Sequence, residues 1–294
     1  MKTTVRSAFP RVKKLFWRFI RVMILLAPAF LMLAPVVLLL SGSIMSRQEL
    51  AANLKPVLEG GSGYISWSLI PDYPTLIHYG KLLFMTPQFF IVFWNSVKLV
   101  GCILLGQLVI GVPAAWAFAV FRFKGRNILF TLYVILMLMP FQVTMLSQYL
   151  VLDSLNLMNT HWAIILPAVF STFPVFLVYR GFCSLPKGLL EAGRIDGAGE
   201  WYLFFKIGIP LSSGGILSAV VLGFTEYWNL IEQPLAFLKD QSLWPLSLYL
   251  PEISPDQAGY AFAASVITLI PAVFIFLLGR DYLEQGIVAA ALKE

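Results

Sequence analysis

Charged residues are scarce in this sequence. Asp, Glu, Lys and Arg make up 12% of the 294 residues, whereas a soluble domain carries about 25%. Hydrophobic residues make up 59%, and the mean hydropathy is +0.81. This composition excludes an ordinary soluble domain and places the chain in a lipid bilayer.

The residues and motifs of common catalytic and metal sites are also missing. Cys102 and Cys183 fall on different hydrophobic segments, both expected toward the inner side, so no structural disulfide is expected. His78 and His161 have no Cys or acidic partner at ligand spacing, which argues against a metal site. There is no GxxxxGK(S/T), HExxH or GxSxG run. The chain is therefore not expected to bind ATP phosphates itself, and its energy must come from a partner.

What the sequence does contain is a series of long apolar segments. Each is long enough to cross about 30 Å of hydrocarbon as a helix. The first is too long for the apolar core of a cleaved signal peptide, so it is expected to stay as a span. The six predicted spans are 22–46, 89–121, 127–152, one that ends at Tyr179, 207–230 and 257–279.

The distribution of basic residues predicts the orientation of these spans. Residues 1–21 hold seven Lys and Arg and no acidic residue. Sixteen of the 21 Lys and Arg fall on the proposed inner segments, which is a positive-inside bias and places both termini in the cytoplasm. Because the basic residues cluster at span ends rather than along one face, topology explains them better than nucleic-acid binding does.

The resulting plan has one membrane domain between two cytoplasmic ends. A basic N-terminus, 1–21, precedes the six-span domain, 22–280, and a cytoplasmic tail, 281–294, follows it. The polar connections are an external loop at 47–88, a cytoplasmic loop at 183–206 and an external loop at 232–256. Residues 75–84 of the first external loop are expected to be helical.

The cytoplasmic loop and its flanks, residues 185–211, are neither uniformly apolar nor a simple loop. Ser184 is a plausible N-cap for a helix that begins at Pro186, and Gly197 with Gly199 is expected to end that helix. An apolar run resumes at Trp201. A short helix, a glycine hinge and a second helix between two membrane segments predict a docking element on which another protein pushes.

The spacing inside this element resembles the EAA loop of binding-protein-dependent ATP-binding-cassette (ABC) importer permeases. Glu-Ala-Gly is followed after three residues by Gly, after nine more by Ile, and then by Ile-Pro. A helix that enters a partner's cleft needs small residues and a charge, which favours this interpretation over an ordinary amphipathic loop with solvated charges. The residues that the resemblance assigns to ATPase coupling are Glu191, Ala192, Gly193, Asp196, Gly197, Ile207 and Pro210.

Shorter matches extend the resemblance over most of the chain, to the carbohydrate-importing branch that contains the second permease of the maltose transporter. They imply an all-α polytopic membrane protein with six transmembrane helices and the type I ABC importer permease (MetI-like) fold. The matching runs are Asn95-Ser96, 117–119, 122–126, Met139-Pro140, 155–160, 195–198, Trp228-Asn229 and 286–293.

The resemblance also implies a function and partners. The chain would be a non-enzymatic permease for a carbohydrate in a bacterial cytoplasmic membrane. It would pair with a second permease, two ATP-binding subunits that hold the ATP, and an extracytoplasmic substrate-binding protein. The tail would reach toward the ATPases, although Ala290 stands where the family has a glycine and a frayed terminus is the alternative.

Three residues late in the fifth span, Glu226, Trp228 and Asn229, have two interpretations. Polar side chains deep in a membrane usually face a cavity or another helix, so these could line the translocation path, with Trp228 offering a flat face to sugar rings. Equally, they could lie at the membrane boundary or pack between helices.

Two other function classes compete with the importer. An ion-gradient-driven secondary transporter would need ionisable groups or broken helices at mid-membrane, and only Lys98 and Glu226 come close. A membrane enzyme would need clustered acid, base or metal groups, and the sequence offers no such cluster.

Overall fold

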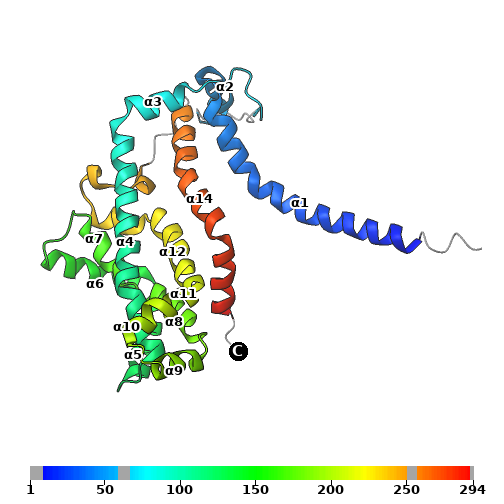
Figure 1. Cartoon of the computed structure of the whole chain (residues 1–294). Coiled ribbons are helices and arrows are strands. Elements are labelled where there is room, and N and C mark those ends of the chain that lie inside the picture. The colour runs from blue at the N-terminus through cyan, green and yellow to red at the C-terminus, as the bar shows by residue number, and fades with distance from the viewer. Residues whose placement is uncertain (1–8, 59–66, 250–256, 292–294) are drawn as a thin grey trace, which may run out of the picture. The chain divides into compact units, whose positions relative to one another are not determined.

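The computed structural model describes residues 9–58, 67–249 and 257–291. Within these ranges all regular secondary structure is helical, as the family resemblance implied (Figure 1). The chain divides into two compact units. The first contains residues from 1–85 and 251–267, and the second contains residues from 86–250 and 268–294.

The first unit is built from three helices and the first turns of a fourth. α1 (Phe9–Ile44), α2 (Arg47–Leu58), α3 (Ile77–Met85) and the start of α14 (Ala258–Ala291) form it. α3 confirms the helix expected over 75–84. Met45 and Leu50 are fully buried at its centre, and the Trp67 indole donates a hydrogen bond of 3.0 Å to Ser41 Oγ.

The second unit packs α8 and α12 along the long helix α4 (Figure 1). Its core lies around Trp116, whose ring centroid is 5.1 Å from that of Phe182 and 5.5 Å from that of Phe204. Its helices are α4 (Pro87–Val120), α5 (Arg126–Met137), α6 (Phe141–Ser154), α7 (Trp162–Val169), α8 (Thr172–Cys183), α9 (Lys187–Ile195), α10 (Glu200–Tyr202), the π-helix η1 (Leu203–Gly208), α11 (Ile209–Leu211), α12 (Ser213–Trp228), α13 (Glu232–Phe237), and the 3-10 turns η2 (Gln241–Leu243) and η3 (Leu246–Leu248).

Glycines allow the closest helix contacts of this unit. A Cβ on Gly215 of α12 would lie 3.2 Å from the Cα of Gly181 on α8, so two backbones touch there. A Cβ on Gly208 would lie 2.5 Å from the Trp116 ring. Gly215 and Gly181 thus bring α12 against α8, and Gly208 lets η1 lie against the Trp116 ring of α4.

The spans predicted over 127–152 and 207–230 are not single straight helices. α5 and α6 are bent by 104° at residues 138–140, because Pro140 has an extended ψ of 144° and cannot donate a helical hydrogen bond. The helical stretch Glu200–Leu211 and α12 are bent by 68° at Ser212. The two predicted spans are therefore each interrupted by a bend, which their largely apolar sequences do not signal.

Four helical stretches are long and apolar enough to span a membrane, one of them formed by α7 and α8 together, and the number rises to six if each bent pair is one span. The four are Arg21–Ile44, Pro87–Val120, Trp162–Cys183 and Ala258–Tyr282. The helices extend beyond the predicted spans at both ends of the chain: α1 begins at Phe9 inside the basic N-terminus, and α14 continues past Arg280 to Ala291. Charge therefore marks where an apolar surface stops, not where a helix stops.

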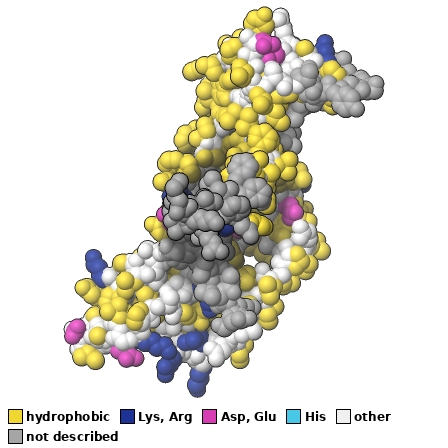
Figure 2. Space-filling view, turned by 90° about the vertical axis from the view of Figure 1, so that its right-hand side faces the viewer, with side chains coloured by type: hydrophobic (Ala, Val, Ile, Leu, Met, Phe, Trp, Pro, Cys, Tyr) yellow, Lys and Arg dark blue, Asp and Glu magenta, His cyan; other side chains and the backbone are white. Residues whose placement is uncertain are grey.

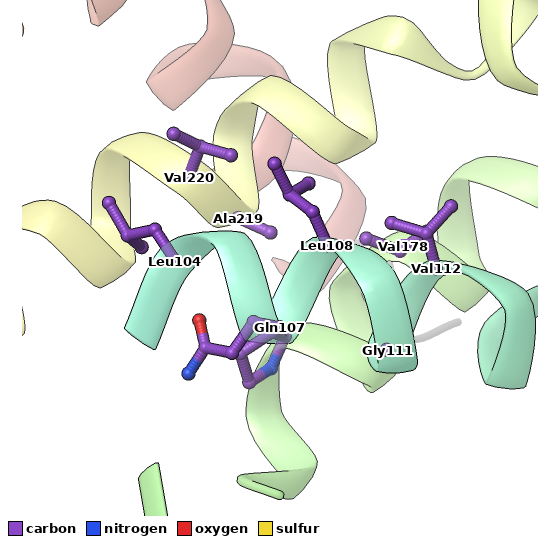
Figure 3. A pocket seen from close by; sticks show the side chains of 9 residues that line it. Leu104, Gln107, Leu108, Gly111, Val112, Val178, Ala219 and Val220 are labelled. Carbon is purple, nitrogen blue, oxygen red and sulfur yellow. The ribbon is translucent and has the colours of Figure 1, made fainter. Parts of the chain in front are cut away.

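A buried amide ties three helices of the second unit together. Gln107 on α4 donates hydrogen bonds of 2.8 Å to the carbonyl oxygen of Ala168 and 2.9 Å to the Tyr227 hydroxyl. Figure 3 shows Gln107 beside a small apolar void near Leu108 and Ala219. The amide has its donors satisfied, so its burial supports packing of α4, α7 and α12.

Candidate functional site

α9 lies across the lower end of the second unit, beside the start of α5 (Figure 1). Ser184 was predicted to be the N-cap of α9, and this prediction was wrong. Ser184 is the C-cap of α8, and its hydroxyl donates to the Gly181 carbonyl over 2.7 Å. Pro186 precedes the first helical residue of α9 instead, with no side-chain cap. Two adjacent helix ends share this short stretch, and the sequence alone does not assign Ser184 to one of them.

Gly197 closes the helix in the geometry that glycine favours. Its φ is +83°, and α9 ends at Ile195, two residues before it. The Ala198 amide donates to the Gly193 carbonyl over 2.9 Å, and the Gly197 amide donates to the Arg194 carbonyl over 3.1 Å. These two bonds form a Schellman motif, so the predicted glycine break is confirmed and has a defined backbone shape.

Gly193 faces the second unit's interior rather than the solvent. A Cβ at this position would lie 2.7 Å from Leu203 Cδ2, and Leu203 is fully buried. Leu190, one turn earlier, is also buried in the Trp116 core. α9 therefore packs directly against η1, which follows it. This close contact requires a residue without a side chain at Gly193, whereas Ala192 is exposed.

The charged residues of α9 point outward. Glu191 and Asp196 are exposed, and Asp196 is the C-cap residue whose amide donates to the Ala192 carbonyl over 3.0 Å. Arg194 forms a two-point ion pair with Glu200 across the bend: Nε donates a hydrogen bond of 2.8 Å to Oε1, and Nη2 donates one of 3.2 Å to Oε2. This hydrogen bond with Glu200 raises the pKa of Arg194, and the fork fixes α9 relative to α10.

Large apolar side chains surround the bend in exposed positions. Ile195 is 86% exposed and Trp201 is 73% exposed, and the Trp201 and Phe205 rings stack with centroids 6.0 Å apart. Sequence reasoning missed these residues, although an isoleucine placed between Arg194 and Asp196 was a visible signal. Exposed apolar groups beside Glu191 form a surface suited to a protein partner.

Basic side chains occupy the same end of the second unit. Figure 2 shows Lys and Arg gathered at this lower end, below the apolar surface of the helices. Arg122 and Lys124 are exposed in the turn between α4 and α5, and Lys187 is exposed on α9. Gly125, with φ of +84°, shapes that turn.

Ile207 and Pro210 connect the bend to the membrane helices. Ile207 lies in η1 and packs against the Trp116 core. Pro210 lies in α11, immediately before the 68° bend at Ser212. π-helical turns are frequent at functional sites. Ile207 and Pro210 therefore lie in the short, tightly packed segment that joins α9 to α12.

The loop after α12 is pinned to α4 at the opposite end of the unit. Asn95 Nδ2 donates to the carbonyl oxygens of Ser242 and Trp244 over 2.7 and 3.1 Å, and the Leu246 amide donates to Ser96 Oγ over 2.7 Å. Asn159, with φ of +58°, accepts from the amides of Lys239 and Asp240. These contacts account for the Asn95-Ser96 pair and for Asn159.

His161 joins the same network. Its Nε2 lies 3.1 Å from the Leu243 carbonyl oxygen and its Nδ1 lies 3.1 Å from Lys98 Nζ. Burial lowers the pKa of His161, and the Lys98 charge lowers it further, while the bond to Leu243 opposes both. Among the described residues, no three His, Cys, Asp or Glu side chains gather as a metal site would require.

A cavity of ≈ 620 Å³ opens among α6, α7, α8 and the segment from α12 to α13. Glu226 and Asn229 line it, whereas Trp228 does not. Trp228 is 3% exposed, stacks on Phe224 with centroids 5.3 Å apart, and donates from Nε1 to the Thr268 carbonyl over 3.2 Å. The geometry thus separates the three candidates: two face a cavity and Trp228 packs between helices.

Phe170 is the most exposed of the three aromatic residues that line this cavity, the others being Phe141 and Tyr227, and sequence reasoning did not single it out. Phe170 lies between α7 and α8 and is 60% exposed. The sequence around Phe170 does not distinguish it from the other phenylalanines of this chain. Only the orientation of α7 and α8 about their axes places it in the cavity lining.

Comparisons with known proteins agree with this architecture. The family model described as "Binding-protein-dependent transport system inner membrane component" matches residues 107–289. The arabinooligosaccharides transport system permease protein AraQ of Halalkalibacterium halodurans is 31% identical over 82% of this chain and 88% of its own length. The sn-glycerol-3-phosphate transport system permease protein UgpE of Yersinia pestis is 32% identical over 66% of this chain and 71% of its own length.

A solved structure has the same fold. One chain of a bacterial ABC transporter involved in the import of the acidic polysaccharide alginate superimposes with a TM-score of 0.77 at 20% identity, over 95% of this chain and 99% of that one. A second structure of a bacterial alginate transporter, in complex with its pentasaccharide-bound periplasmic protein, gives a TM-score of 0.56 at 16% identity, over 93% of this chain and 97% of that one.

Proposed function

Because the chain belongs to the family of binding-protein-dependent transport system inner membrane components, we propose that it is a permease subunit of an ABC importer for a carbohydrate. The name of its relative AraQ, an arabinooligosaccharide permease, supports a saccharide cargo. An extracytoplasmic binding protein delivers the cargo, and separate ATP-binding subunits supply the energy. The chain itself performs no covalent chemistry and is not an enzyme.

The observation that carries this proposal is the closed bend after α9. A Schellman cap at Gly197 holds Ile195 outward in an exposed position, and Leu203 locks Gly193 to the following helix. A partner that binds Ile195, Trp201 and Glu191 would therefore move α9 and η1 as one body. Of the coupling residues proposed from the EAA resemblance, all but Pro210 lie between the start of α9 and the end of η1, and Pro210 follows in α11.

The direction of the movement follows from the fold. When two ATP-binding subunits close, they would displace α9, and the bend at Ser212 would transmit the displacement to α12. The cavity that Glu226 and Asn229 line would then change from inward-facing to outward-facing. This is a rigid-body switch between two packed arrangements.

The remaining subunits are assigned by the same reasoning. A second permease would complete the translocation path opposite this chain, and a binding protein would dock on the external loop 232–256. The solved relative that carries a bound periplasmic protein supports such docking. Residues 250–256 of the loop lie outside the described residues.

The orientation proposed for the chain places the basic end in the cytoplasm. Arg122, Lys124 and Lys187 share that end with α9, which agrees with the positive-inside rule. Both termini would be cytoplasmic, and the chain would reside in a bacterial cytoplasmic membrane. The contact proposed between the tail and the ATPases falls on 281–294, of which 292–294 and the side chains from 283 onward lie outside the described residues.

Reconstitution tests the function directly. The chain, its partner permease and the ATP-binding subunits are inserted into liposomes, and uptake of saccharides presented by the cognate binding protein is measured with ATP, without ATP and with an imposed proton gradient. ATP-dependent uptake is expected. Uptake driven by the proton gradient in the absence of ATP would favour the ion-coupled alternative and overturn the importer.

A further inference from the structure

The cavity among α6, α7, α8 and α12, here called the cargo cavity, has the size of a ligand site. Its volume of ≈ 620 Å³ falls in the range of about 300–1,000 Å³ typical of small-molecule pockets. It lies wholly within the second unit, so one compact part of the chain sets its shape. Its chemistry can therefore be read from this chain alone.

One wall offers a flat apolar face. Phe170 lines the cavity and remains 60% exposed, in contrast to Trp228, which is buried in the packing of α12. An aromatic face can pack against the C–H side of a sugar ring, and it adds apolar contact without demanding a hydrogen bond. Phe170 takes the stacking role for which the sequence suggested Trp228.

Two buried amide oxygens in the same lining have no protein partner. Gln148 Oε1 and Gln233 Oε1 are inaccessible to solvent and make no hydrogen bond with the described residues. Because neither oxygen is accessible to solvent, neither faces the open volume of the cavity, although other atoms of the two side chains line it. Asn229, which is exposed and lines the cavity, donates from its amide nitrogen to the Thr225 carbonyl over 2.9 Å, so its own oxygen is left to accept. A hydroxyl group of a cargo molecule is a suitable donor for that oxygen.

The charge of the cavity has one sign. Glu226 and Glu232 line it, and the described lining residues include no Lys, Arg or His. Gln142 holds the Glu232 carboxylate with hydrogen bonds of 3.1 and 3.2 Å from Nε2. Like charges brought together away from bulk water repel strongly, so an anionic cargo meets two carboxylate side chains and, among the described lining residues of this chain, no compensating cation.

We propose that the cargo cavity binds an uncharged, polyhydroxylated molecule, with Phe170 as its stacking face, the Asn229 amide oxygen as a hydroxyl acceptor, and Glu226 and Glu232 as a barrier to anions. This inference rests on the proposed importer function and names the cargo class. It separates the chain from relatives described as transporting alginate, an acidic polysaccharide, or sn-glycerol-3-phosphate, and places it with the arabinooligosaccharide permeases.

Thiol modification of the assembled importer tests the charge. In a background with Cys102→Ser and Cys183→Ser, Thr144→Cys places a thiol in the cargo cavity, and Ser154→Cys places one at the exposed end of α6 outside it. Each is reacted with the trimethylammonium and the sulfonate methanethiosulfonate reagents. The ratio of the two rates cancels changes in thiol ionisation, because both reagents attack the same thiolate.

The rate ratio is expected to favour the cationic reagent at Thr144→Cys. Adding E226Q and E232Q should reduce that preference about tenfold, while the ratio at Ser154→Cys stays unchanged. A ratio at Thr144→Cys that the two substitutions leave unchanged overturns the anion barrier. An equal shift at both sites also overturns it, because the effect would then not belong to the cavity.

Protection of the same thiol tests the cargo class. Arabinotriose and maltotriose serve as neutral probes and trigalacturonate as the anionic one, each added to the importer without its binding protein. At least one neutral probe should slow modification at Thr144→Cys several-fold, trigalacturonate should not, and Phe170→Ala should abolish the protection while Phe170→Tyr retains it. Protection by trigalacturonate or by none of the probes overturns the inference. Both readouts are independent of ATP, so they are separate from failure of ATP-driven uptake, which would overturn the proposed function instead.

Discussion

Replacement of Gly197 by alanine is the sharpest perturbation of the coupling bend. The φ of +83° forces any L-residue into the left-handed region, at about 1–2 kcal/mol for alanine. No atom lies within 4 Å of the added Cβ, so the backbone alone bears this cost. A free energy of that size shifts the equilibrium between the closed and the unwound bend about five- to thirtyfold.

Gly199 provides a matched control. It lies two residues away, has an ordinary φ of −71°, and likewise has no atom within 4 Å of an added Cβ. Gly199→Ala is therefore expected to be neutral, or to stabilise the fold slightly by restricting the unfolded chain. Gly197→Asn should retain part of the function, because asparagine tolerates the left-handed region better than alanine does.

The assay is retention of the ATP-binding subunits on the affinity-tagged permease during purification, together with saccharide taken up per ATP hydrolysed in liposomes. Gly197→Ala should lower both values and Gly199→Ala neither, with Gly197→Asn between them. Thermal unfolding of the solubilised chain should change little, since the bend lies at the end of the second unit. Equal behaviour of Gly197→Ala and Gly199→Ala would refute the reasoning.

Three further changes test neighbouring contacts. Glu191→Ala removes an exposed charge and should weaken retention of the ATP-binding subunits without altering thermal unfolding. Gly193→Ala adds a Cβ that would lie 2.7 Å from Leu203, so it should lower the unfolding temperature, and Leu203→Ala should relieve that effect. Arg194→Ala breaks a pair whose side chains are 40% and 44% exposed, so it should cost no more than about 1 kcal/mol in unfolding yet reduce retention more than Arg194→Lys does. Burial lowers the pKa of His161, so the native contacts favour its neutral form. The stability that these contacts contribute is complete above pH about 6.5, the ordinary pKa of histidine, and is lost as the pH falls below that value. Hydrogen exchange of residues 239–246 should therefore accelerate on acidification beyond the intrinsic rate change, but not in His161→Gln.

The sequence predicted the elements whose signal is local. Glycine directly after an amphipathic turn commonly ends a helix, which is why Gly197 was predicted as a break, and the structure gives it a positive φ. The membrane spans followed from length and hydropathy in the same way. The bend proposed for ATPase coupling was also predictable from sequence, because the motif spacing that resembles the family lies in one continuous segment, residues 191–210.

Features that depend on helix rotation or on neighbouring segments were not predictable. Trp228 and Phe170 are both aromatic and both near polar residues, and only the packing of α12 decides that Phe170 faces the cavity. Ser184 belongs to the helix before it because the backbone turns at Pro186. The 104° bend near Pro140 was hidden because a charge-free run satisfies the hydropathy of a straight span equally well.

The central claim is that the α9 bend faces the cytoplasm and is held there by an ATP-binding subunit. In the cysteine-free chain, Ile195→Cys and Phe84→Cys introduce thiols at two positions that are both 86% exposed, one beside the bend and one on α3. A membrane-impermeant maleimide applied to intact cells should label Phe84→Cys and not Ile195→Cys, and a bifunctional thiol reagent should join Ile195→Cys to an ATP-binding subunit. Labelling of Ile195→Cys from outside the cell, or its failure to cross-link in an importer that hydrolyses ATP, would contradict the account.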